Sequence, residues 1–248
     1  MIGQHIIRLS EIDSTNNYAS ELSKTDKWSE GTAIIAEFQT GGRGQRGTVW
    51  QSLRGQNLTM SIILTPDIHC ITGAFALNKA VAVALRNALA RFVAGPVWIK
   101  WPNDILTTDG KLAGILIENL MNADRIERCI AGIGININQT DFNLLRATSL
   151  KLLTGYQHSI DEVFGEVCCS MEAVYSRLKA GETESIEDEY NWNLFGLGSF
   201  RTFSDNVEEF EAEVLGTDDF GRLKLKDMTG SIRIYDVKSV VWESDLKT

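Results

Sequence analysis

The sequence GTAIIAEFQTGGRGQRGTVW occupies residues 31–50 and carries the most informative local pattern in the chain. Its first part, residues 32–38, is a short apolar run bounded by glycine, which predicts a buried strand. A glycine-rich loop with Arg43 and Arg46 follows it. Glycine lets backbone N–H groups approach a ligand closely, and arginine presents a planar charged group suited to carboxylate or phosphate. The stretch therefore predicts a strand that leads into an anion-binding loop.

Two other glycine motifs share this spacing, and the surrounding sequence argues against both. Residues 42–47 satisfy the dinucleotide-binding pattern and, with Val49, the glycine loop of protein kinases. A dinucleotide fold needs a helix directly after the third glycine, whereas residues 57–64 form another strand-like run. A kinase needs a strand lysine soon afterwards, but the first one downstream is Lys79, and HRD and DFG motifs are absent. A surface loop without a ligand is the remaining alternative.

Length and composition define the broad class of protein. The chain has 248 residues, 44% hydrophobic and 23% charged, which predicts one large or two modest globular domains. A net charge of −9 argues against general affinity for DNA, RNA or anionic membranes. The sequence lacks a long apolar run and a signal peptide, so we expect a cytoplasmic protein. The cysteines and histidines show no zinc-site spacing, and we expect no metal site made by the protein alone.

A helix is predicted close to the N-terminus. Residues 13–17, DSTNN, supply candidate capping side chains, and residues 18–22 carry apolar side chains at helical spacing. One interpretation is that Ser14 or Thr15 caps the helix and has no other role. Alternatively, their hydroxyls and the unpaired amides of the first turn face a neutral, hydrogen-bonding ligand.

The middle of the chain predicts a helix followed by an antiparallel meander. Residues 73–93 have alanine and leucine at helical spacing. Residues 97–101, 111–118 and 128–138 read as strands, and Asp109-Gly110 is a hairpin signal. This meander brings together five polar candidates for a site: Lys100, Asn103, Asp104, Lys111 and Asn136. The alternative is that the lysines are solvated strand ends. Glycines at 114, 132 and 134 interrupt the strands and commonly mark a bulge or close approach by a ligand.

The C-terminal part changes character after two helical segments. Residues 159–162 form a capping box that predicts a scaffold helix ending at Gly181, and residues 184–194 form a second helical piece. From residue 200 onward, short alternating runs separated by turns predict a small antiparallel barrel. The sequence assigns no functional role to any residue of this barrel.

Five motifs in order resemble those of biotin protein ligases. They are residues 13–16 (DSTN), 39–47 (QTGGRGQRG) with Trp50, 100–104 (KWPND), 111–116 (KLAGIL) and 132–136 (GIGIN). KWPND is the most specific of them. The resemblance implies an α+β fold: a mixed, largely antiparallel sheet with helices on one face, as in class II synthetases, followed by a small SH3-like β-barrel. It places the catalytic domain at residues 1–196 and the barrel at 197–248.

The resemblance also implies an activity. Such ligases form biotinyl-5′-AMP from biotin and ATP, and then pass biotin to a lysine on a carrier domain of a biotin-dependent carboxylase, releasing AMP and pyrophosphate. Attack of a carboxylate on a phosphate brings two anions together, so the site must supply positive charge and hold both groups in line. The resemblance implies that Arg43 and Lys111 are the catalytic residues.

The remaining site residues are expected by the same resemblance. The biotin site comprises Ser14, Thr15, Asn16, Gln39, Gly42, Arg43, Lys111 and Gly114. The ATP site comprises Arg43, Gly44, Arg46, Trp50, Lys100, Asn103, Asp104 and Asn136. Magnesium is expected to arrive with ATP, since Mg²⁺ is usually held by substrate phosphates and one carboxylate at most, for which Asp104 is the candidate.

One position departs from the family pattern. Many members have arginine where this chain has Gln45, and that arginine helps to retain the reactive adenylate. Glutamine carries no charge, so we assign no catalytic role to Gln45. We expect Arg43, Arg46 and Lys111 to retain the intermediate instead.

Other functions are less consistent with the sequence. Only 12 residues precede Asp13, too few for a helix-turn-helix domain, so we expect the monofunctional type that does not bind DNA. A lipoate or octanoate ligase or transferase is the nearest enzyme alternative, but those lack the GRG loop combined with KWPND. A non-enzymatic biotin-binding module would not need Lys111 or the nucleotide asparagines, and ATP-dependent turnover separates it from a ligase.

Overall fold

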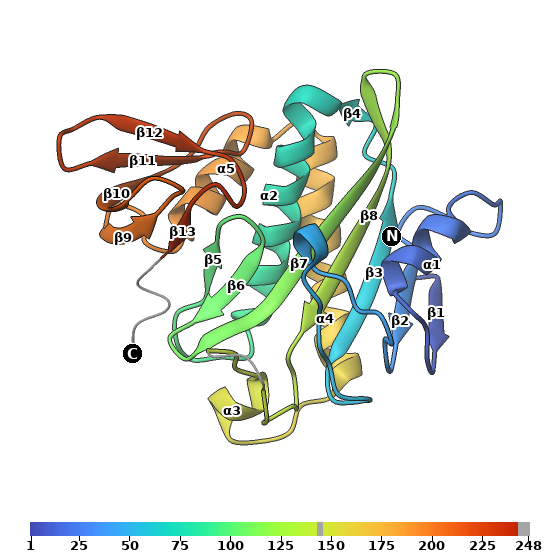
Figure 1. The fold of residues 1–248 in the computed structure, drawn as a ribbon. Helices are drawn as coiled ribbons and strands as arrows, with labels where there is room; N and C mark the ends of the chain where they lie inside the picture. The colour runs from blue at the N-terminus through green and yellow to red at the C-terminus, as the bar shows by residue number, and fades with distance from the viewer. Residues whose placement is uncertain (143–145, 243–248) are drawn as a thin grey trace.

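Two β-sheets organise the chain (Figure 1). The computed structural model describes residues 1–142 and 146–242. The larger sheet has eight strands in the order β1-β2-β3-β8-β7-β6-β5, with β4 also paired to β8. Only β1 and β2 pair in parallel among the described strands. The strands are β1 Ile6–Leu9, β2 Ala33–Ala36, β3 Leu58–Leu64, β4 Ile68–His69, β5 Trp98–Lys100, β6 Asp104–Thr107, β7 Gly110–Asn122 and β8 Arg125–Ile135.

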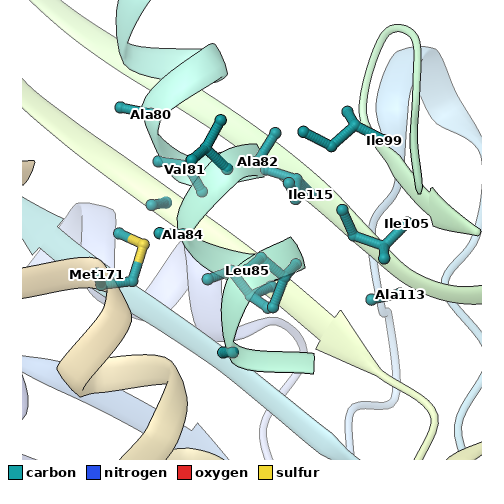
Figure 2. Close-up of a cluster of buried hydrophobic side chains, with 14 of the residues drawn as sticks. Ala80, Val81, Ala82, Ala84, Leu85, Ile99, Ile105, Ala113, Ile115 and Met171 are labelled. Atoms are coloured by element: carbon teal, nitrogen blue, oxygen red, sulfur yellow. The ribbon is translucent and has the colours of Figure 1, made fainter. Parts of the chain in front are cut away.

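The long helices α2 (Cys70–Leu89) and α4 (Ile160–Lys179) cover one face of this sheet. Figure 2 shows Val81 and Leu85 of α2 beside Ile99, Ile105 and Ile115 of the sheet. These side chains are almost fully buried, and burial of each contributes about 1.5–3 kcal/mol. The alanine-rich pattern of α2 lets the helix approach the strands closely. α5 (Thr183–Trp192) packs against α2 and α4.

The short helix α1 (Thr15–Leu22) packs on the opposite face of the sheet. Ala19 of α1 forms a small separate cluster with Ile34, Ile63 and Ile130 from β2, β3 and β8. Every residue of β3 is buried, so this strand needs cover on both faces. The expected mixed, largely antiparallel fold is therefore confirmed, but the expectation of helices on one face fails for α1.

The second sheet contains five antiparallel strands, as expected for the C-terminal barrel. Its order is β12-β11-β10-β9-β13. The strands are β9 Phe200–Ser204, β10 Glu209–Thr217, β11 Leu223–Asp227, β12 Ile232–Tyr235 and β13 Val241–Trp242. The Trp101 indole N–H donates to the Gly221 carbonyl at 2.8 Å and ties this sheet to the larger one. The division into domains at residues 196 and 197 stays a prediction.

Several short elements were not predicted from the sequence. They are β1, β4, β6, β9 and α3 (Leu150–Thr154). β6 follows the cis Trp101–Pro102 bond, where the sequence indicated only a break, and it pairs with both β5 and β7. In residues 1–142 and 146–242, no helix is long and apolar enough to span a bilayer.

Candidate active site

A cavity of about 700 Å³ lies at the surface of the larger sheet. The start of α1, the glycine-rich loop, strands β5 to β8 and residues 237–242 of the second sheet form its walls. In Figure 1 the loop that carries the short 3₁₀ helix η1 (Gln45–Gly47) lies over β7. The cavity therefore gathers segments from the beginning, middle and end of the chain.

Three glycines on the strands beneath the cavity leave room for side chains to pack directly against the backbone. Gly114 of β7 pairs with Gly134 of β8, and Gly132 lies two residues further along β8. A Cβ atom at Gly134 would overlap the Trp50 indole, and one at Gly114 would lie 3.2 Å from the same ring. A Cβ at Gly132 would overlap the amide of Asn16. The glycine interruptions in the strands are thus required by side chains that lie flat on the sheet.

A buried hydrogen-bonding corner lies at one end of the cavity. Gln39 Oε1 accepts from the Thr15 backbone N–H at 2.7 Å and from the Thr15 hydroxyl at 3.0 Å. Ser14 occupies the N-cap position of α1 and is buried, yet its side chain makes no capping hydrogen bond. Because the Ser14 hydroxyl is not used as a cap, the second interpretation of this motif, donors and acceptors aimed at a ligand, is favoured.

The glycine-rich loop forms a short hairpin beside this corner. Trp50 N–H donates to the Gly42 carbonyl at 3.0 Å, and Gly44 N–H donates to the Thr48 carbonyl at 2.7 Å. A Cβ at Gly42 would overlap the Trp50 carbonyl, and one at Gly44 would overlap the Thr48 hydroxyl. These two glycines are therefore needed for the loop to fold back on itself. The side chain of Arg46, expected at the ATP site, lies outside what the structure describes.

Arg43 is held by two acceptors at the rim of the cavity. Its Nη1 donates to Asn17 Oδ1 at 2.6 Å, and its Nη2 donates to Glu118 Oε1 at 2.6 Å. The Arg43 side chain is 44% exposed and that of Glu118 33% exposed. The guanidinium group has a fixed planar shape, so two acceptors determine its orientation while other N–H bonds stay available to a ligand.

A β-bulge aims Lys111 into the cavity. Asp104 of β6 pairs with Gly114 of β7, but the register shifts so that Leu106 pairs with Lys111. In a regular strand Lys111 and Gly114 would point to opposite faces, whereas the extra residue in the bulge places them on the same face. Lys111 Nζ lies 2.7 Å from Asp104 Oδ1 and 5.8 Å from the centroid of the Trp50 ring.

Lys100 adds a second cation on the side of the C-terminal sheet. It pairs with Asp104 across β5 and β6, and its Nζ lies 5.7 Å from the centroid of the Trp242 ring. The pKa of Lys100 is lowered to about 8, mainly by burial and to a lesser extent by the nearby cations Lys111 and Arg146, while Asp104 opposes the change. Burial of a cation disfavours its charged form, which is the direction of this pKa shift.

The two asparagines expected at the nucleotide also brace the strands. Asn103 Nδ2 donates to the Ile115 carbonyl at 2.7 Å, and Asn136 Nδ2 donates to the Lys111 carbonyl at 3.3 Å. Both residues line the cavity. Their donors fix β7 beside the bulge that presents Lys111.

The structure brings nearly all the expected residues to one cavity. Its lining contains the expected residues Ser14, Thr15, Asn16, Gln39, Arg43, Gly44, Trp50, Lys100, Asn103, Asp104, Lys111, Gly114 and Asn136. Gly42 lies outside the lining and acts through the loop hairpin. Sequence reasoning missed the contribution of Val237, Lys238 and Trp242, because nothing in the chain predicts which barrel turn faces the larger sheet.

The cavity therefore combines a neutral hydrogen-bonding corner with cationic side chains, a combination suited to a small carboxylic acid. Residues 9–136 match the Biotin/lipoate A/B protein ligase family, and the chain belongs to that family.

Individual relatives agree with this assignment over most of the chain. The bifunctional ligase/repressor BirA of Bacillus subtilis strain 168 is 34% identical over 240 residues, which make up 95% of this chain and 73% of the relative. The biotin acetyl-CoA-carboxylase ligase of Paracoccus denitrificans is 36% identical over 132 residues, 52% of this chain and 53% of that relative. The biotin protein ligase from Aquifex aeolicus, solved with biotin and ATP, has a TM-score of 0.78 at 26% identity and covers 96% of this chain and 98% of its own.

Proposed function

We propose that this chain activates biotin with ATP to biotinyl-5′-AMP and then transfers biotin to a lysine of a carrier domain. The observation that carries the proposal is that one cavity contains both a neutral hydrogen-bonding corner and cationic side chains. Biotin carries both kinds of partner, a neutral ureido ring and a carboxylate.

The corner of Ser14, Thr15 and Gln39 would bind the ureido ring. These side chains offer hydroxyl donors and acceptors within a buried pocket, where an unpaired polar group is costly. Thr15 and Gln39 already hydrogen-bond each other, whereas the Ser14 hydroxyl makes no capping bond, and a ligand without ureido groups, such as lipoate, would give it no partner. A site built to hydrogen-bond its substrate rejects analogues that lack the polar groups, so this corner selects biotin over lipoate.

The cationic end would carry out the adenylation. The biotin carboxylate oxygen attacks the α-phosphorus of ATP, a new oxygen–phosphorus bond forms, and the bond to pyrophosphate breaks. Lys111 and Arg43 would reduce the repulsion between the two anions and stabilise charge on the phosphate as the bond changes. The Trp50 indole, which lies against Gly114 and Gly134, would offer a face to the adenine of ATP.

Asp104 fits the expected role of a magnesium ligand. Its side chain is 25% exposed within the cavity and lies beside Lys111, and Mg²⁺ bound with nucleotide uses few protein carboxylates. Magnesium would neutralise phosphate charge. If Asp104 turned to the metal ion, Lys111 would lose its present ion-pair partner and interact with substrate instead.

The transfer step would complete the reaction. The amine of a carrier lysine attacks the carbonyl carbon of the biotinyl-adenylate, an amide bond forms, and AMP leaves. Relatives named as biotin acetyl-CoA-carboxylase ligases support a carrier of the biotin-dependent carboxylase class. A cytoplasmic location and the absence of DNA or membrane partners are part of the same proposal.

Labelling of a carrier domain tests the whole reaction and the role of Gln45. With biotin, ATP and Mg²⁺, we expect one lysine of a biotin carboxyl carrier domain to be modified, as mass spectrometry of the intact domain would show. We expect bystander proteins to stay unlabelled, because Arg43 and Lys111 supply charge at the adenylate although Gln45 does not. Bystander labelling at a rate comparable to the carrier would contradict retention of the intermediate.

The pKa of Lys100 predicts the pH dependence of ATP use. Lysine is charged below its pKa, so its attraction for phosphate is present below about pH 8 and is lost as pH rises through that value. We expect kcat/KM for ATP, which reports the unliganded enzyme, to fall above this pH. Lys100→Arg stays charged, so its kcat/KM should remain level to higher pH. Identical pH profiles for the two proteins would remove Lys100 from the ATP site.

A further inference from the structure

A chain of hydrogen bonds connects the corner of Ser14, Thr15 and Gln39 to Arg43. Beyond Gln39 and Thr15, the Ser61 hydroxyl lies 2.8 Å from Thr15 Oγ1 and 2.6 Å from Asn16 Oδ1. Asn16 Nδ2 then donates to Glu118 Oε2 at 2.8 Å. Neither Ser61 nor Glu118 lines the cavity, and Ser61 is fully buried. The corner and the arginine are therefore connected through Ser61 and Glu118, which lie outside the cavity lining, and through Asn16, which belongs to it.

Glu118 uses its two oxygens for two different parts of the site. Oε2 accepts from Asn16 of α1, and Oε1 accepts from Arg43 of the glycine-rich loop. Glu118 itself belongs to β7, so its position is set by the sheet. The carboxylate thus fixes both α1 and the loop relative to the strand that carries Lys111.

Asn16 has little freedom to change partners. Its Nδ2 also approaches the Leu116 carbonyl at 3.3 Å, so both ends of the amide are already hydrogen-bonded. The bare backbone of Gly132 makes this placement possible. Although Asn16 lines the cavity, its amide acts as a link between Ser61 and Glu118.

We propose that Glu118 is a positioning residue for Arg43, supported from behind by Asn16 and Ser61. Two fixed acceptors, Glu118 and Asn17, orient the guanidinium plane, and its remaining N–H bonds stay available to the anionic substrate. Such preorganisation matters because small displacements of a charged group that stabilises a transition state are costly in rate. This inference rests on the proposed adenylation and assigns a role to residues outside the cavity wall.

A double-mutant cycle between Glu118 and Arg43 tests the inference. In Glu118→Gln, the amide keeps the shape of the side chain but cannot accept from both Asn16 and Arg43 with two oxygens. We expect kcat for biotin-dependent pyrophosphate release to fall about tenfold, with a smaller change in KM for ATP. In the Arg43→Ala background, the same Glu118→Gln change should have no further effect on kcat, because the contribution of Glu118 to kcat passes through Arg43.

A matched control and a second variant distinguish a positioning role of Glu118 from a general loss of folded structure. Glu127→Gln removes an exposed carboxylate on β8 that pairs with Arg128, and it should leave kcat unchanged. Ser61→Ala breaks the chain behind Asn16 without touching Arg43, and its loss of kcat should also disappear in the Arg43→Ala background. Melting temperatures establish that each variant is folded.

The outcomes distinguish this inference from the proposed function. Independent, multiplicative effects of Glu118→Gln and Arg43→Ala would overturn the positioning role, as would wild-type kcat in Glu118→Gln. If the wild-type chain released no pyrophosphate with biotin, the proposed function itself would fail. A fall in kcat that persists in Arg43→Ala would show that Glu118 acts on the site by another route.

Discussion

Replacement of Lys111 by alanine is expected to lower biotin-dependent pyrophosphate release by about 10²–10³-fold, the usual effect of losing one group that stabilises transition-state charge. The β7 bulge aims this lysine at the cavity, and its Nζ lies over Trp50 and beside Asp104. The loss should appear in kcat more than in the affinity for biotin, because charge develops on the phosphate during the reaction. Steady-state kinetics with a coupled pyrophosphate assay measures both.

The melting temperature of Lys111→Ala shows whether its loss of activity comes from unfolding. The Lys111 side chain is 35% exposed, so its removal should change the melting temperature little. Lys24→Ala removes another lysine that pairs with a carboxylate, at an exposed position just after the C-terminal end of α1 and outside the cavity lining, and should retain wild-type kcat. A Lys111→Ala enzyme that stays within threefold of wild type would contradict the role given to this residue.

Gly134→Ala is expected to cause the largest combined loss of activity and stability. The added Cβ would overlap the Trp50 indole on the cavity floor, so the ring or the strand must move. Overpacking of this kind costs about 1–3 kcal/mol. In a chain of this size each kcal/mol lowers the melting temperature by about 2–4 °C. Displacement of Trp50 into the cavity should reduce biotin binding by about 100-fold or more, measured by calorimetry, which corresponds to roughly 2.8 kcal/mol.

The chain offers a matched control for this glycine substitution. Gly165 lies in the middle of α4, and a Cβ there would meet no atom within 4 Å outside the helix itself. Gly165→Ala should therefore stabilise the protein by about 0.5–1 kcal/mol, because glycine is unfavourable inside a helix. Trp50→Ala combined with Gly134→Ala should recover part of the lost stability. Equal melting temperatures for Gly134→Ala and wild type would show that Trp50 does not occupy the floor.

Much of the site could be predicted because its residues lie in short motifs with recognisable spacing. The helix after residue 14, the strand before Gln39 and the meander that carries Lys100 and Lys111 all follow from local patterns. The glycines at 114, 132 and 134 indicated close approach by a ligand or a bulge, whereas the structure shows that protein side chains, Trp50 and Asn16, approach them. The glycines thus correctly predicted a close approach to the strands, but they did not predict which group approaches.

The unpredicted features depend on contacts between distant parts of the chain. Asn16 meets Glu118 across more than a hundred positions, and no sequence periodicity reports such a pairing. Trp242 reaches the cavity because long-range contacts, among them the bond from Trp101 to Gly221, hold the second sheet against the larger one. Likewise, β3 is buried on both faces because α1 covers the second one, whereas the polar residues Thr59 and Ser61 in its sequence do not predict burial of that face.

Pyrophosphate release from ATP and Mg²⁺ by the purified chain, with biotin, with lipoate and with neither, tests the central claim most directly. The presence in one cavity of neutral hydrogen-bonding side chains, Ser14, Thr15 and Gln39, and of the cations Lys111 and Arg43 predicts release with biotin alone. Release with lipoate alone would move the chain to the lipoate branch of its family. No release with either acid would contradict adenylation and leave a binding protein.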